Sequence, residues 1–292
     1  MKEFNLRLFL DLFASLLFMS GVPVIIKFTS VNPVTIGIVR LLIASVLMGL
    51  LLIIRKEKMS MNPRNLKNLM LIGLVFSIHW VTYFFSIKIS TASIGILGAS
   101  TYGIHLIVLG WIFLNTKPTW IDGLAITLAF VGTYIIIPEF TLSNEITVGL
   151  MLSILSGLFF ALLPILHQKN QQMTNNVRSM GQYVFALPLF LVFSKHFDFS
   201  MKAADIYSLL YLGIFGTFLA HTFWINVTTK LPTTFTSLIF YVIIPFTMAL
   251  SYFWLNESMN IEKITGAVLI ILANVIGILR KFKRVQMPMD LD

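Results

Sequence analysis

The sequence predicts an all-α membrane protein built from ten transmembrane helices. Of its 292 residues, 57% are hydrophobic and only 11% are charged, whereas about 25% of the residues in a soluble domain are charged. The hydrophobic residues gather in runs of roughly 20, a length that crosses the hydrocarbon core of a bilayer as a helix. Lipid offers no hydrogen-bond partner to a backbone, so these runs are expected to be helical.

The ten spans follow one another with short connections. No small-x-small cleavage site follows a short apolar core at the N-terminus, so we interpret the first span as a permanent helix and not as a signal peptide. The longest polar breaks are RKEKMSMNPRNLK (55–67) and HQKNQQMTNNVRS (167–179), and neither leaves room for a soluble domain. The predicted spans are residues 8–27, 34–54, 68–87, 92–114, 120–138, 147–166, 178–195, 206–227, 233–255 and 263–280.

The distribution of basic residues predicts that both termini are cytoplasmic. Of the 21 Lys and Arg residues, Arg40 lies within a span and five would lie outside if the N-terminus were inside. The other fifteen would then lie in cytoplasmic segments. Membrane proteins show this excess of Lys and Arg on the cytoplasmic side. The net charge of +9 therefore reflects topology, and we expect no nucleic-acid partner. The five outer residues are Lys27, Lys88, Lys195, Lys202 and Lys263.

Composition excludes several kinds of site. The chain contains no cysteine, which rules out disulfides, thiolate metal sites and cysteine nucleophiles. No stretch resembles a Walker A phosphate-binding loop, and no span carries a His-Glu-x-x-His pattern. We therefore expect no metal and no cofactor, and the energy for any transport would come from a gradient or from the substrate itself.

The second half of the sequence repeats the first. Residues 111–132 align with 252–273 at a shift of 141, and FSIHWVTYFF (76–85) aligns with FLAHTFWINV (218–227) at a shift of 142, which superimposes their histidines. Each copy holds five spans. Because five is odd, the second copy enters the membrane in the opposite direction. We therefore predict an inverted repeat, with a site between the halves near the middle of the membrane.

The fourth span of each half ends in a similar loop, FLNTKPTW (113–120) and WLNESMN (254–260), and the fifth carries small residues seven positions apart. With ten spans in two inverted repeats, these motifs resemble the drug/metabolite transporter superfamily, EamA type, although Thr116 stands where the family usually has the glutamate that Glu257 keeps. The resemblance implies movement of metabolites or drugs across the inner membrane, often as efflux. Its central cavity would lie between the third, fourth, eighth and ninth helices. It divides the chain into a first repeat (1–140), a second repeat (141–284) and a short cytoplasmic tail (285–292).

Two histidines lie inside spans at equivalent positions of the two halves, His79 and His221. Ionisable groups inside a membrane are costly and usually face the bundle interior or water, and histidine titrates near neutral pH. We expect both to bind substrate and to carry a coupled proton; the alternative is a packing residue inherited twice. His105 is a further candidate for substrate binding, and Asp11 for proton coupling.

Aromatic residues on the third, fourth, eighth and ninth spans are expected to line the cavity. Most aromatic residues in membrane bundles serve packing, but those at mid-depth need partners for their N–H or O–H groups, which a wet cavity supplies. Such walls suit flat or cationic substrates. Ser100 and Asn226 would add hydrogen bonds. The aromatic candidates are Trp80, Tyr83, Tyr102, Trp224 and Tyr241.

Other residues within or beside the spans are expected to be structural. Arg40 lies roughly 10 Å below the outer end of its span at 1.5 Å per residue, and an ion pair or a snorkelling side chain is expected there. Glu257 is expected to order the loop after the ninth span. Pro23, Pro164 and Pro245 interrupt helical hydrogen bonding and are expected to bend helices that gate the cavity.

Two other functions fit parts of the sequence. Ser100, in GASTYG (98–103), would form the dyad of an intramembrane serine protease with His221, but its motif lacks the following glycine. A flippase for lipids or lipid-linked substrates is the second alternative. The sequence favours a transporter over an enzyme, namely a secondary active transporter for a small metabolite or drug-like molecule, such as an amino acid or amine. It would work by alternating access with the proton as preferred coupling ion; the sequence indicates neither its direction nor an oligomeric state.

Overall fold

The computed structural model describes residues 6–59, 62–114, 119–137, 141–231 and 240–286, which are helical apart from their connections. Six segments of these residues are long and apolar enough to cross a membrane. They are α1 (Leu6–Phe28), α2 (Pro33–Ile54), α3 (Pro63–Ile89), α4 with α5 (Ala92–Ala99 and Tyr102–Leu114), α7 (Glu145–Lys169) and α9 with η2 and α10 (Ala203–Gly213, Ile214–Leu219 and Ala220–Lys230).

The remaining helices are shorter or less apolar. They are α6 (Trp120–Ile136), α8 (Asn175–Leu191), α12 (Ile243–Leu255) and α13 (Ile261–Gln286), with one 3₁₀ turn, η1 (Ser194–His196). The helices begin and end within a few residues of the predicted spans, except that α8 stops at Leu191 and α13 continues to Gln286. The start of the predicted ninth span (233–239), Thr116 and residues 287–292 of the predicted tail lie outside the described residues.

Local sequence signals start the helices. The dipeptides Asn32–Pro33 and Asn62–Pro63 open α2 and α3, with asparagine as the N-cap and proline at the first helical position. The Asn32 side chain accepts hydrogen bonds from the N–H groups of Val34 (2.9 Å) and Thr35 (3.0 Å). These groups have no partner inside the helix, so the cap satisfies donors that would otherwise be unpaired.

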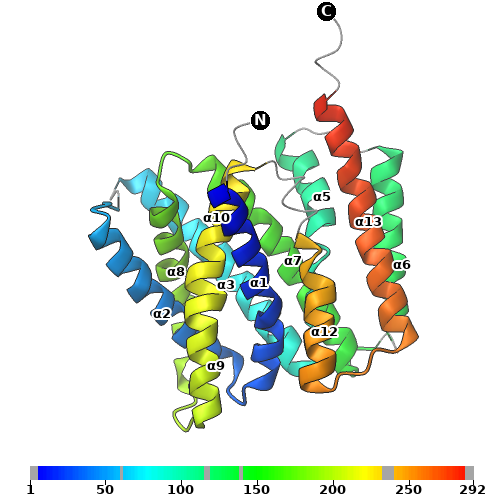
Figure 1. Cartoon of the computed structure of the whole chain (residues 1–292), viewed down its shortest axis with the longest axis horizontal. Helices are drawn as coiled ribbons and strands as arrows, with labels where there is room; N and C mark the ends of the chain where they lie inside the picture. The colour runs from blue at the N-terminus through cyan, green and yellow to red at the C-terminus, as the bar shows by residue number, and fades with distance from the viewer. Residues whose placement is uncertain (1–5, 60–61, 115–118, 138–140, 232–239, 287–292) are drawn as a thin grey trace, which may run out of the picture.

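Helices that are equivalent in the sequence repeat make equivalent contacts. The α3 helix packs on α7, and its counterpart, the η2–α10 segment, packs on α1; α2 packs on α8, and α6 on α13. Figure 1 shows the start of α1 and the end of α13 at the same end of the bundle, called the upper end below. The opposite, lower end carries the connections α1–α2, α3–α4, α8–α9 and α12–α13.

Turns lie at matching positions of the two repeats. Residues 100 and 101 form a turn between α4 and α5, and residues 241 and 242 form a turn just before α12, at a shift of 141. Between α9 and α10, the π-helical turn η2 widens the helix over residues 214–219. Single π-helical turns of this kind are common at functional sites.

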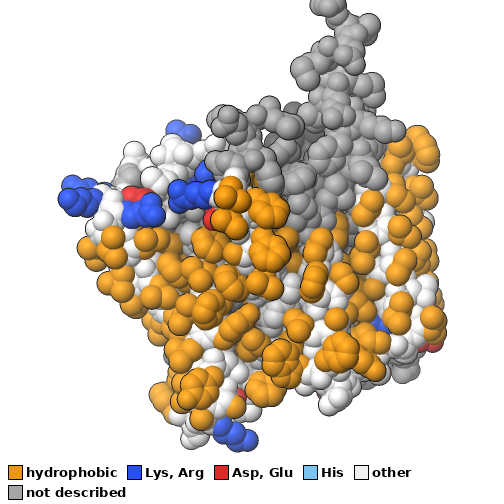
Figure 2. Space-filling view, viewed as in Figure 1, with side chains coloured by type: hydrophobic (Ala, Val, Ile, Leu, Met, Phe, Trp, Pro, Cys, Tyr) orange, Lys and Arg blue, Asp and Glu red, His pale blue; other side chains and the backbone are white. Residues whose placement is uncertain are grey.

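The outer surface of the bundle is apolar between its ends. Large side chains on several helices, such as Phe13, Val46, Phe130 and Phe253, are 58–78% exposed. Figure 2 shows hydrophobic side chains over most of this face and charged side chains near its upper and lower ends. This distribution is expected of a protein whose solvent is the hydrocarbon of a bilayer.

Close packing of α3 on α8 gives a stability prediction. A Cβ added to Gly73 would lie 2.5 Å from Cβ and 2.6 Å from the backbone carbon of Phe185, whereas one added to Gly123 meets no atom within 4 Å. Overpacking of this kind costs about 1–3 kcal/mol. We expect Gly73→Ala to lower the melting temperature in detergent and the control Gly123→Ala to keep or raise it. Equal melting temperatures for the two variants would contradict the packing described.

Candidate functional site

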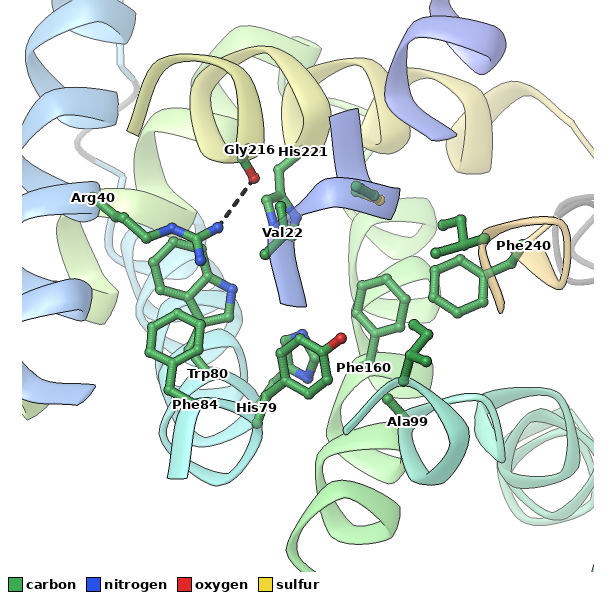
Figure 3. A pocket seen from close by; sticks show the side chains of 14 residues that line it. Val22, Arg40, His79, Trp80, Phe84, Ala99, Phe160, Gly216, His221 and Phe240 are labelled. Atoms are coloured by element: carbon green, nitrogen blue, oxygen red, sulfur yellow. Dashed lines mark hydrogen bonds between the residues drawn. The ribbon is translucent and has the colours of Figure 1, made fainter. Parts of the chain in front are cut away.

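A cavity lies in the interior of the bundle. Its volume is about 50 Å³, so its walls lie close together. Figure 3 shows Arg40, Trp80 and Phe84 on one side of it, with Phe160 and Phe240 on the other. The lining residues are Met19, Val22, Arg40, His79, Trp80, Tyr83, Phe84, Ile96, Ala99, Phe160, Gly216, His221, Phe240 and Ile243.

Both halves of the sequence contribute equivalent residues to this lining. Two pairs of lining residues are related by the shift of 141, and the two histidines by the shift of 142. The cavity is therefore surrounded by segments that repeat in the sequence. These pairs are Met19 with Phe160, Ala99 with Phe240, and His79 with His221.

His79 is anchored by α7. Its Nδ1 lies 3.1 Å from the backbone oxygen of Ser156 and 2.7 Å from the hydroxyl Oγ, which also donates to the backbone oxygen of His79 at 3.0 Å. A carbonyl can only accept, so a bond to it requires the hydrogen on Nδ1 and leaves Nε2 as an acceptor. The ring packs between Tyr83 and Phe160, with centroids 5.8 and 4.8 Å away.

His221 is held by aromatic packing. Its ring meets Phe76 edge-on at 4.9 Å and lies 5.8 Å from Trp80. Among the described residues, no side chain or backbone group makes a hydrogen bond with its imidazole. Its ring nitrogens are thus available to a molecule in the cavity, whereas His79 has one nitrogen already engaged.

Arg40 reaches the cavity from α2. Its Nε donates to Thr217 Oγ1 at 2.9 Å and its Nη2 to the backbone oxygen of Gly216 at 3.1 Å, both on the η2 turn. The guanidinium carbon lies 4.1 Å from the ring centre of Trp80 and 5.0 Å from that of Phe84. The predicted snorkelling or ion pairing does not occur within the described residues: the side chain is 1% exposed and points inward.

Two predicted aromatic residues lie behind the lining. Tyr102 is 5.1 Å from Phe160 and 5.3 Å from Phe240, measured between ring centres, and Trp224 is 5.6 Å from Phe240. They support Phe160 and Phe240, which form the apolar wall. Tyr241 is buried beside this wall and is not among the lining residues.

The other polar candidates lie away from the cavity. Ser100 donates to the backbone oxygen of Leu97 at 2.6 Å, and no hydrogen bond joins it to His221 within the described residues. The Nε2 of His105 lies 3.1 Å from the backbone oxygen of Ile154. The side-chain amide of Asn226 donates to Asp11 Oδ2 at 2.6 Å, so these two predicted functional residues bind each other.

The predicted structural residues have definite places. Pro23 and Pro164 lie inside α1 and α7, whereas Pro245 lies in the first turn of α12, where its missing N–H removes no bond of that helix. Glu257 follows α12, and its carboxylate accepts hydrogen bonds from the N–H groups of Ala92 (2.6 Å) and Ser93 (3.1 Å). It therefore caps α4 in addition to its place in the loop after α12.

Sequence reasoning missed the contribution of α1 and α7 to the cavity. Met19 and Val22 line it from α1, and Phe160 lines it from α7. The signal was present, because Met19 and Phe160 align at the shift of 141 and each lies four residues before an aligned proline. Proline cannot bond to the carbonyl four residues earlier, which marks these turns as irregular.

Comparison with known proteins identifies similar sequences and folds. The model of the EamA-like transporter family matches residues 8–137 and again residues 147–279. No curated protein sequence matches the chain. A solved structure described as "Crystal structure of protein" is similar with a TM-score of 0.69, covers 96% of this chain and 99% of its own, and is 14% identical in sequence. At this identity the likeness concerns the fold.

Proposed function

Because this chain belongs to the EamA-like transporter family, we propose that it is a secondary active transporter that moves a small metabolite across the inner membrane by alternating access. In this proposal the protein crosses the membrane ten times and has both termini in the cytoplasm. Its two repeats, 1–140 and 141–284, are inverted with respect to each other. The substrate binds in the central cavity, where His79, His221 and the aromatic wall contact it.

The observation that carries this proposal is the cavity lined by equivalent residues of both repeats. Two inverted halves around one site can close in two nearly equivalent ways, one toward each side of the membrane. The contacts between equivalent helices, α3 with α7 and α10 with α1, are those that such a two-fold relation produces. A small rotation of one half against the other would then exchange the two closures.

Carboxylates of the second repeat close the lower end of the bundle. Asp205, at the start of α9, accepts hydrogen bonds from the Thr29 hydroxyl and from the N–H and hydroxyl of Ser30, each at 2.7 Å. Asp198 accepts from the N–H of Asn32 at 2.7 Å, and Glu257 caps α4. Under the proposed topology this end is the outer one, so these contacts support a state closed toward the outside.

The upper end has a matching contact. Glu57 accepts hydrogen bonds from Asn176 at 2.7 Å and from the hydroxyl of Thr174, which is the N-cap of α8. Glu57 and Asp198 are related by the shift of 141, and each binds the start of a helix in the other repeat, α8 or α2. We interpret the contacts of Glu57 and Asp198 as equivalent latches, meaning hydrogen bonds between the two repeats that hold the upper and the lower end of the bundle closed.

Reconstitution tests the proposed activity. The purified protein is screened by thermal shift against a metabolite library, and compounds that stabilise it are tested for uptake into proteoliposomes with and without a pH gradient. We expect saturable uptake of at least one such compound and faster uptake when the gradient drives protons with it. Stabilising compounds that never cross the vesicle membrane would contradict transport, and uptake insensitive to the gradient would contradict proton coupling.

A further inference from the structure

Arg40 is a buried cation without a counter-ion. It is 1% exposed within an apolar helix, and both of its hydrogen-bond partners, Thr217 and Gly216, are neutral. Its Nη1 has no hydrogen-bond partner, and no carboxylate lies within ion-pairing distance, among the described residues. A charge inside a membrane is costly and is normally paired, so this site lacks one negative charge.

The surroundings of Arg40 orient its free edge toward the cavity. The rings of Trp80 and Phe84 pack against the guanidinium, and the η2 turn holds two of its nitrogens. In Figure 3 the guanidinium points from α2 into the lined space. A guanidinium fork matches the two oxygens of a carboxylate. The same contacts disfavour a cationic substrate, because Arg40 already occupies a face of Trp80.

The rest of the cavity is apolar on the side away from Arg40. Phe160 and Phe240 form that wall, with Ala99 beside them. The second repeat supplies no counterpart of the Arg40 charge. At the shifts of 141 and 142, Arg40 aligns with Gly181 and Gln182, and neither of these residues lines the cavity. One charged group at one end and an apolar wall at the other favour a ligand with a single anionic group and an apolar remainder.

We propose that Arg40 is the carboxylate-binding residue of the cavity and that the substrates are small monocarboxylates with an apolar or aromatic tail. This inference rests on the proposed transport function and narrows its substrate class. The acid group would lie against Arg40, within reach of the imidazole of His221, and the tail would lie against Phe160 and Phe240. The buried positive charge is then neutralised only when substrate is bound.

The charge preference of the wild-type protein tests this directly. Binding is measured by fluorescence of the tryptophans and by thermal shift for matched series of small acids, amides and amines, such as benzoate, benzamide and benzylamine or butyrate and butyramide. We expect at least one acid to bind at least about tenfold more tightly than its amide, as for a hydrogen bond to a charged group. Binding of none of the acids, or an amide or amine that binds as tightly as its acid, would overturn the proposal.

Variants assign the preference to Arg40. We expect Arg40→Gln to weaken acid binding about 10- to 100-fold and Arg40→Lys to weaken it less. The control is Arg178→Gln: Arg178 is also buried, and it donates to the backbone oxygen of His167 at 2.6 Å outside the cavity. That variant should keep acid binding. A folded Arg40→Gln protein that binds acids as the wild type does would overturn the assignment, and if it does not fold, the wild-type series decides.

The outcomes separate this inference from the proposed function. Selective acid binding without uptake into proteoliposomes would support the site and contradict transport. Uptake of amides or amines at the rate of the matching acids would support transport and contradict the role of Arg40.

Discussion

The double variant His79→Ala, His221→Ala is expected to lose most transport. Both imidazoles line the cavity, and the ring nitrogens of His221 have no partner among the described residues, so a substrate group bound by them would lose its hydrogen bonds. Losing bonds to a charged group costs about 1.5–3 kcal/mol, which corresponds to a fall of about 10- to 100-fold in the initial rate. The residual uptake should no longer respond to a pH gradient. The measurement is initial uptake into proteoliposomes.

His167→Ala is the matched control for this prediction. His167 is a third buried histidine, on α7, but its Nε2 lies 2.8 Å from Gln182 Oε1 and it does not line the cavity. Its loss should lower thermal stability and leave the pH response of transport intact. A double variant that transports normally and still responds to pH would show that His79 and His221 are packing residues.

The variant Asp198→Asn, Asp205→Asn is expected to open the lower end of the bundle. Asp205 alone accepts three hydrogen bonds at 2.7 Å from Thr29 and Ser30. The negative charge of a carboxylate strengthens each hydrogen bond that it accepts. An asparagine amide keeps some of these contacts but lacks that charge, so the remaining hydrogen bonds are weaker. A loss of about 1.5–3 kcal/mol would raise the population open at this end about 10- to 100-fold.

Thiol labelling measures this opening, because the natural chain has no cysteine. A single cysteine in place of Ala99, which lines the cavity, should react faster with a membrane-impermeant reagent added on the lower side. Glu57→Gln, at the opposite latch, should accelerate labelling from the upper side. Glu262→Gln is the control, since Glu262 is exposed at the lower end. Unchanged labelling in the aspartate variant would contradict the closure described.

The helices were predictable because their signals are local. Apolar length, and caps such as Asn32 and Asn62, depend only on neighbouring residues, so α1–α3 and α7 begin near their predicted positions. Interruptions at residues 100–101 and the π-helical turn η2 depend on packing and have no comparable local signal. The inverted arrangement of the repeats follows from their odd number of spans and stays a prediction.

The site was predictable in part: Trp80 and Tyr83 were expected from their place on the third span, and both line the cavity. His79 and His221 were found as an aligned pair, and both line the cavity. Ser100 and Asn226 were polar residues on plausible helices, but the sequence does not tell which neighbour each one meets, and they bind Leu97 and Asp11. Arg40 was expected to be structural, because only the folded chain reveals that its partners on η2 carry no negative charge.

We propose that one cavity between two inverted halves opens to each side of the membrane in turn. The most direct test is labelling of the single-cysteine variant Ala99→Cys, in cells and in inside-out vesicles, with an impermeant thiol reagent. We predict labelling from both sides, with protection on both sides by a compound that the protein transports. A cysteine that reacts from one side only, or from neither, would contradict alternating access through this cavity.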